Sequence, residues 1–201
     1  MNQPPTATAL HEEKERTERT NLGLWVYLMT DVILFGCLFA TYAVLYKNTV
    51  GGPSGAELFN LPMILGSTIL LLTSSFTSGL LVLAMRARSR ARTALWLITT
   101  IILGSIFLIL ELTEFRELVA EGNSWSRSGF LTAFFTLVAT HGLHILAGII
   151  WAIALLVQLF QRGFTAGVVR RVPLFAMFWH FLDVIWIFIF TFVYLMGVVS
   201  L

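Results

Sequence analysis

Cysteine and charged residues are both scarce in this chain of 201 residues. Cys37 is the single cysteine, which excludes a disulfide framework and a cysteine-rich metal cluster, and its apolar neighbours predict a small core residue. Charged residues make up only 12% of the chain, about half the share typical of a soluble domain, whereas 57% of the residues are apolar. This composition excludes a soluble enzyme domain, a disordered chain and a nucleic-acid binder with a basic face.

Five long apolar runs predict five membrane-spanning helices, because one span needs about 20 apolar residues. The expected spans are residues 22–46, 61–85, 94–118, 130–160 and 172–200. Pro173 would open the last span in its first helical turn. Residues 1–21 are polar and predict a disordered cytoplasmic tail that lacks the apolar segment of a signal peptide. We therefore expect an all-α membrane protein whose residues 22–201 form a five-helix transmembrane bundle.

Lysine and arginine are distributed unequally between the two sides of such a bundle. The side of the N-terminus holds ten of the 13 basic residues and the opposite side holds three. Because basic loops remain in the cytoplasm, we expect a cytoplasmic N-terminus and a periplasmic C-terminus. A short basic loop on the cytoplasmic side predicts contact with anionic lipid headgroups or with a partner protein. Its residues are Arg86, Arg88, Arg90 and Arg92.

Seven ionisable side chains fall inside the expected spans, where each costs about 2.5–3.5 kcal/mol to insert. They are Asp31, Glu111, Glu114, His141, His144, His180 and Asp183. Six of them form pairs three residues apart, so both members of a pair share one helix face. At about 1.5 Å of rise per residue, their depths predict two layers. The inner layer would place Asp31 beside His180 and Asp183, and the outer layer would place Glu111 beside His141 and His144.

Four interpretations of these buried residues remain open. Two carboxylates and two histidines on four helices suggest a di-iron site, although Glu and His never share a helix in the Glu-x-x-His spacing. His144 and His180 could ligate a haem, and titratable groups in a bundle can mark a proton or ion pathway. In the fourth interpretation they form a buried polar network that fixes helix register. That reading suits an accessory subunit; the alternative is a small stand-alone ion or metal carrier.

Small residues are concentrated at two places in the expected spans. Residues 67–79 are rich in serine and threonine and end on a glycine, which favours close helix packing over a polar pore. Gly148 and Ala152 form a small-xxx-small pair that predicts a close helix contact in the fourth span.

Three motifs together resemble subunit III of the haem–copper terminal oxidases. They are WHFLDVIW at residues 179–186, HGLH at 141–144 and ELTEF at 111–115. The resemblance covers about residues 22–197, and five spans correspond to the short form of this subunit. Residues 39–45, followed by Gly51-Gly52-Pro53, are most similar to subunit III of the cytochrome o-type ubiquinol oxidases. Asp31 stands where the family usually carries a buried glutamate, so any role that needs the longer side chain is in question.

This resemblance implies a non-catalytic accessory subunit of a proton-pumping quinol:dioxygen oxidase, part of the aerobic respiratory chain in the bacterial inner membrane. It implies no catalytic, cofactor-binding or metal-binding residues in this chain, with haem, copper and ubiquinol belonging to partner subunits. The implied partners are the haem–copper catalytic subunit I, subunit II, a small subunit IV and phospholipids, with no nucleic acid. The chain would stabilise subunit I and bind phospholipid in a V-shaped cleft between its first two helices and the other three.

Overall fold

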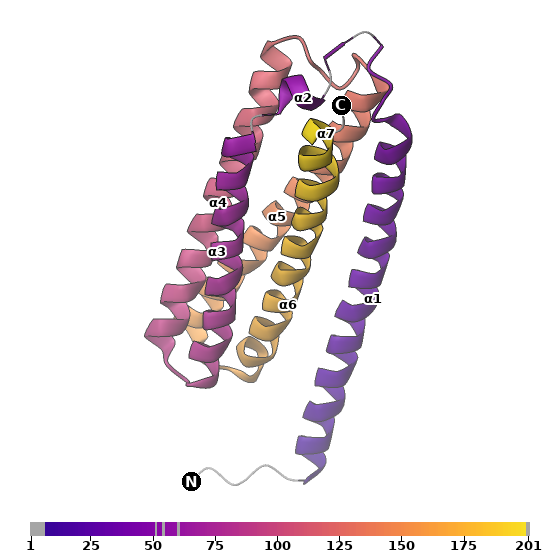
Figure 1. Ribbon diagram of the computed structural model, residues 1–201. Helices are drawn as coiled ribbons and strands as arrows, with labels where there is room; N and C mark the ends of the chain where they lie inside the picture. The colour runs from indigo at the N-terminus through magenta and orange to yellow at the C-terminus, as the bar shows by residue number, and fades with distance from the viewer. Residues whose placement is uncertain (1–6, 51, 54, 60, 200–201) are drawn as a thin grey trace.

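Five long helices dominate the computed structural model, which describes residues 7–50, 52–53, 55–59 and 61–199 (Figure 1). They are α1 (Ala7–Leu45), α3 (Leu61–Arg86), α4 (Arg90–Ala120), α5 (Gly129–Arg162) and α6 (Ala166–Ile189). Three short elements complete the described chain: α2 (Gly55–Leu58), the π-helix η1 (Phe190–Leu195) and α7 (Met196–Val199). Each long helix, with α6 continued through η1 and α7, is long and apolar enough to cross a membrane. The predicted all-α fold with five membrane-spanning helices is confirmed.

Two helices begin earlier than the apolar runs indicate. Helix α1 starts at Ala7, so the described part of the predicted disordered tail is helical; Pro4 and Pro5 lie outside the described residues. Helix α6 starts after Thr165, whose side chain accepts a hydrogen bond from the Val168 amide and caps the helix. Pro173 therefore lies inside α6, not in its first turn, and the prediction that it opens the span is wrong.

The helices pack in an order that differs from their order in the chain. Helices α3 and α4 form an antiparallel pair, α6 packs against both α3 and α5, and α5 packs against α4. Helix α1 packs on α5 and α6 at the edge of the bundle, and its N-terminal part runs past the ends of α3 and α4 (Figure 1). Because α3 packs with α4 and α6, the first two spans do not form a separate pair. The predicted position of a cleft, between those two spans and the other three, is therefore wrong.

The indole of Trp179 fills the space where α6 meets α4 and α5. It is fully buried on α6 and lies between a glycine of α4 and a glycine of α5. A Cβ atom at Gly104 would lie 2.8 Å from the indole, and one at Gly148 would lie 2.7 Å from it. A side chain at either position would force the indole or a helix backbone to shift. The close helix contact predicted at Gly148 is confirmed, and its physical reason is the space that the indole occupies.

Most large side chains on the outer surface are apolar, as a lipid-facing surface requires. Helix α1 is the least enclosed span, with only 22% of its most apolar window buried within this chain. Cys37 belongs to this exposed surface, so the prediction that it is a core residue is wrong. It lies on the face of α1 turned away from α5 and α6, a direction that an unbroken apolar run cannot reveal.

Candidate functional site

Asp31 and His144 join helix α1 to helix α5. The Nε2 atom of His144 lies 3.5 Å from Oδ2 of Asp31, and both side chains are largely buried. The Nδ1 atom of His144 lies 2.7 Å from the carbonyl oxygen of Thr140, which can only accept, so Nδ1 carries a proton. The imidazole and the carboxyl group therefore face each other across the interface between the two helices.

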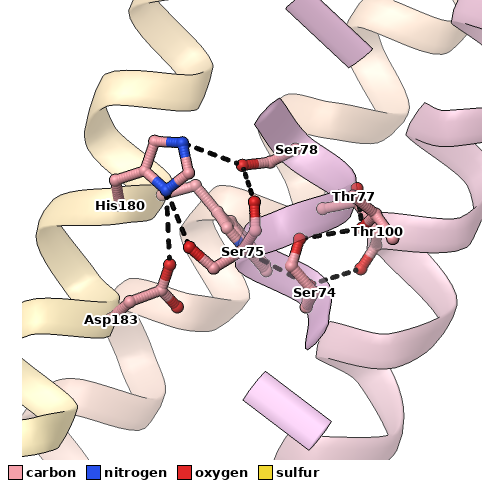
Figure 2. A network of polar contacts seen from close by, with 8 residues as sticks. Ser74, Ser75, Thr77, Ser78, Thr100, His180 and Asp183 are labelled. Atoms are coloured by element: carbon pink, nitrogen blue, oxygen red, sulfur yellow. Dashed lines mark hydrogen bonds and ion pairs between the residues drawn. The ribbon is translucent and has the colours of Figure 1, made fainter. Parts of the chain in front are cut away.

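His180 on α6 is held by two serines of α3 (Figure 2). Its Nδ1 atom lies 2.7 Å from the Ser75 hydroxyl and 3.7 Å from Oδ2 of Asp183. The hydroxyl of Ser78 donates to the carbonyl of Ser75, so its oxygen can accept from Nε2 of His180 at 3.4 Å. The His180 side chain is nonetheless 46% exposed at membrane depth, which leaves part of a polar group on the outer surface.

Further hydrogen bonds of serine and threonine side chains lead from this cluster into the core (Figure 2). Trp179 donates its indole N–H to the Ser74 hydroxyl at 3.2 Å, and that hydroxyl reaches the carbonyl of Thr100 on α4 at 3.4 Å. Thr77 and Thr100 share a hydrogen bond of 2.8 Å across the same two helices. The polar residues of α3 are therefore used for contacts with α4 and α6, which confirms the close packing predicted from their small size.

Glu111 and Glu114 face the interior from helix α4. Glu111 is 5% exposed, and neither of its carboxyl oxygens has a hydrogen-bond partner among the described residues. Its carboxyl group lies close to α5, 3.1 Å from where a Cβ of Gly142 would stand. Tyr194 donates its hydroxyl to Oε2 of Glu114 at 3.3 Å. Tyr194 belongs to η1, where the wider turn of a π-helix redirects side chains relative to an α-helix.

His141 is enclosed by aromatic side chains. Its ring stacks on Trp186 at 5.2 Å between centroids and meets the edge of Phe107 at 6.1 Å. Within the described part of the chain, neither ring nitrogen of His141 has a hydrogen-bond partner. Trp186 is fixed in turn by its indole N–H, which donates to the Thr68 hydroxyl at 3.1 Å.

The structure corrects the two predicted layers. Asp31 pairs with His144, which the depth estimate placed in the other layer, while His180 and Asp183 pair with each other and with α3. The depth of a residue along a helix does not reveal how the helix is rotated about its own axis. The rotation of α1 directs Asp31 toward α5. Glu111 does lie against the predicted helix, α5, although beside Gly142 and without a hydrogen bond to either histidine.

The arginine loop between α3 and α4 is exposed at all four of its arginines. Arg90 donates to the carbonyl of Phe160 at the end of α5, and the guanidinium of Arg88 lies 6.0 Å from the ring centroid of Phe164. These contacts connect the α3–α4 and α5–α6 loops, which lie at one end of the bundle (Figure 1). Arg86 and Arg92 are exposed at the same end of the bundle.

Sequence reasoning missed the partners that come from distant parts of the chain. Thr68 with Trp186 and Tyr194 with Glu114 are separated by 118 and 80 residues, so no local pattern joins them. In residues 7–50, 52–53, 55–59 and 61–199, no three His, Cys, Asp or Glu side chains converge in a group that could hold a metal ion. What the buried polar groups visibly do is connect helices: α1 with α5, α3 with α4 and α6, and α4 with η1.

Comparison with known proteins identifies the relatives of this chain. The family model described as cytochrome c oxidase subunit III matches residues 6–198. A cytochrome bo(3) ubiquinol oxidase subunit 3 from Pseudomonas aeruginosa is 49% identical over 178 residues, which cover 89% of this chain and 85% of the relative. A quinol oxidase subunit 3 from Bacillus spizizenii is 45% identical over 187 residues, 92% of both chains. A cytochrome c oxidase subunit 3 from Bacillus sp. PS3 is 44% identical over 179 residues, 89% of this chain and 86% of the relative.

Proposed function

Because the chain belongs to the cytochrome c oxidase subunit III family, we propose that it is the accessory subunit III of a terminal oxidase that oxidises ubiquinol and reduces dioxygen. The observation that carries this proposal is the match over residues 6–198, together with relatives named as quinol oxidase subunits. The chain works in a membrane-bound oxidoreductase complex of aerobic respiration. Electron transfer and proton pumping belong to its partners, which supply haem, copper and the ubiquinol site.

The partners are the haem–copper catalytic subunit I, with subunit II and a small subunit IV in the same complex. Two features of the surface support such an assembly. Helix α1 is mostly exposed, and the side chain of His180 is only half enclosed at a depth where lipid offers it no hydrogen bond. A neighbouring transmembrane helix would cover both. By this contact the chain stabilises subunit I during turnover.

The position in the membrane follows from the distribution of charge. With ten basic residues on the N-terminal side and three on the other, the chain has a cytoplasmic N-terminus and a periplasmic C-terminus in a bacterial inner membrane. The arginine loop then faces the cytoplasmic leaflet, where Arg86 and Arg92 meet anionic headgroups or a partner.

The site proposed for a phospholipid is a groove between α4 and α5, at the opposite end of the bundle from the arginine loop. The groove there has a volume of about 870 Å³ and a mostly apolar lining that includes Leu112, Phe115 and Phe135. Arg116 also lines it, so one basic group stands beside a surface suited to acyl chains. This pairing of an apolar groove with a cation fits a phospholipid with its phosphate at Arg116. The substitution Arg116→Gln should reduce the phospholipid retained by the purified complex, as counted by native mass spectrometry.

Purification of the affinity-tagged chain tests the main proposal. We expect haem-bearing chains to co-purify in detergent and the preparation to consume dioxygen with ubiquinol as donor. Oxidation of reduced cytochrome c in place of ubiquinol would refute the assignment of the donor while keeping the family. A chain that purifies alone with one or two bound metal ions would instead support a stand-alone carrier.

A further inference from the structure

A small space lies beside the carboxyl groups that α4 turns toward the interior. This acidic cavity has a volume of about 10 Å³ and is lined by Ile64, Ser67, Phe107, Glu111, Glu114 and Trp186. About 10–15 Å³ of such space is needed to hold one water molecule. The acidic cavity is therefore at the lower limit of the space that one water needs, and it is too small for anything larger.

Polar groups around this cavity lack hydrogen-bond partners in the part of the chain that the structure describes. Both carboxyl oxygens of Glu111 lack a partner among the described residues, although Glu111 is only 5% exposed. The hydroxyl of Ser67 donates to the Met63 carbonyl at 3.2 Å, so its oxygen can only accept from the cavity. The indole N–H of Trp186 is already donated to Thr68. Buried polar groups left without partners cost about 1–3 kcal/mol each, so the lining favours a ligand that can both donate and accept hydrogen bonds.

Nearby charges do not compensate the two carboxyl groups. The ion pairs among the described residues include neither Glu111 nor Glu114. His141 stands on the facing helix α5, next to Gly142, yet makes no hydrogen bond with Glu111. Tyr194 of η1 donates to Glu114 and so supports a negative charge on that residue alone. Two ionised carboxylates on one face of a helix in an apolar medium would repel each other.

We propose that the acidic cavity binds one water molecule and one proton shared between Glu111 and Glu114. Glu111 carries the proton and donates it to the water oxygen, while the water donates to Glu114 and to the Ser67 oxygen. Glu114, with donors from the water and from Tyr194, is the ionised member. The proton can cross by a balanced relay: the O–H bond of Glu111 breaks as a bond to the water forms, and the water releases a different proton to Glu114.

This site is built entirely from residues of this chain and does not depend on the oxidase assignment. It adds an exchangeable proton to a subunit whose other buried polar groups hold helices together. A metal cation is a poorer occupant, because the cavity offers at most the two carboxyl groups and one hydroxyl and has no room for hydration water.

Infrared spectroscopy of the purified protein, with whatever partners co-purify, tests the proposal. We expect a carboxylic-acid C=O band that shifts in D₂O and is lost in Glu111→Gln. Glu117→Gln is the matched control, because Glu117 is exposed on the same helix and should leave the band unchanged. A spectrum in which Glu111→Gln removes only carboxylate bands would show an ionised Glu111 and overturn the proposal.

Two substitutions at Ser67 test the water separately. Ser67→Val adds carbon atoms where the cavity lies and should expel the water, so the Glu111 band should move to higher frequency as its hydrogen bond is lost. Ser67→Ala keeps the space for the water, so the Glu111 band should shift less than in Ser67→Val. If the band is the same in the valine variant and the unmodified protein, no water bridges the pair and the proposal is wrong. Because both glutamates remain in these variants, they also serve if Glu111→Gln does not fold.

Discussion

The substitution Gly148→Ala tests how closely helix α5 must approach α6. The added Cβ would stand 2.7 Å from one indole carbon of Trp179 and 3.0 Å from another, well inside van der Waals contact. The indole has little room to retreat, because Gly104 of α4 lies against its other edge. It is also held by its hydrogen bond to Ser74. The change therefore forces either the ring or the whole of α5 to move.

The expected cost follows from three contributions. Forcing extra carbon into a packed core costs about 1–3 kcal/mol. If the ring moves away from Ser74, the lost hydrogen bond adds about 0.5–1.5 kcal/mol. Alanine recovers up to about 1 kcal/mol through its higher helix propensity. We expect a net loss of about 1–3 kcal/mol in the free energy of unfolding.

Equilibrium unfolding in mixed detergent micelles, followed by near-UV circular dichroism, measures this loss. Gly66→Ala is the matched control, because Gly66 lies inside helix α3 and a Cβ there meets nothing within 4 Å. We expect the control to be neutral or slightly stabilising. Adding Trp179→Leu to Gly148→Ala should restore space, so the double variant should lose less than the sum of its two single changes.

The reasoning would be refuted if Gly148→Ala were as stable as Gly66→Ala. Strict additivity of Gly148→Ala and Trp179→Leu would also contradict it, since the clash requires both groups. Either result would mean that the bundle absorbs a methyl group at this contact without moving Trp179.

Three further predictions concern a buried hydrogen bond, a helix cap and a buried pair of ionisable side chains. Thr68→Val leaves the indole N–H of Trp186 without its partner and should cost about 1–3 kcal/mol in the same unfolding assay, whereas an unchanged stability would exclude this bond. Ser128→Ala removes the N-cap of α5 and should cost about 1 kcal/mol; a loss below about 0.3 kcal/mol would argue against the cap. Asp31→Ala and His144→Ala should each weaken the α1–α5 contact and shorten the active life of the assembled oxidase while initial turnover stays nearly intact. Their combined effect should be less than additive, and an immediate loss of most dioxygen reduction in Asp31→Ala would point to proton delivery instead.

Hydrophobicity predicted the fold class, because whether a segment can span a membrane depends only on its composition over about 20 residues. The central three spans begin and end within about four residues of the apolar runs. The ends of α1 and α6 could not be predicted in this way. A polar sequence such as residues 11–20 can also be helical. Backbone hydrogen bonds and pairs such as Arg19 with Glu15 stabilise such a helix, and neither requires apolar side chains.

The identity of the buried polar residues was also predictable, but their partners were not. Each of the seven ionisable groups stands out in an apolar run, so the sequence alone identifies it. The pairing of Asp31 with His144 depends on the rotation of α1 about its axis and on its contact with α5. The partners Tyr194 and Ser75 are ordinary residues of apolar or serine-rich segments, and only the fold places them beside Glu114 and His180.

By itself, the sequence determined that this chain carries five segments long and apolar enough to cross a membrane, and which family its motifs resemble. Those properties come from residue types and their order, because the free energy of transfer from water to lipid is set almost independently for each segment. Only the tertiary structure decided that α6 lies between α1 and α3, that Trp179 fills the gap between two glycines, and that Glu111 opens onto a water-sized cavity. These depend on helix rotation and tilt, which are fixed by the packing of all five helices at once.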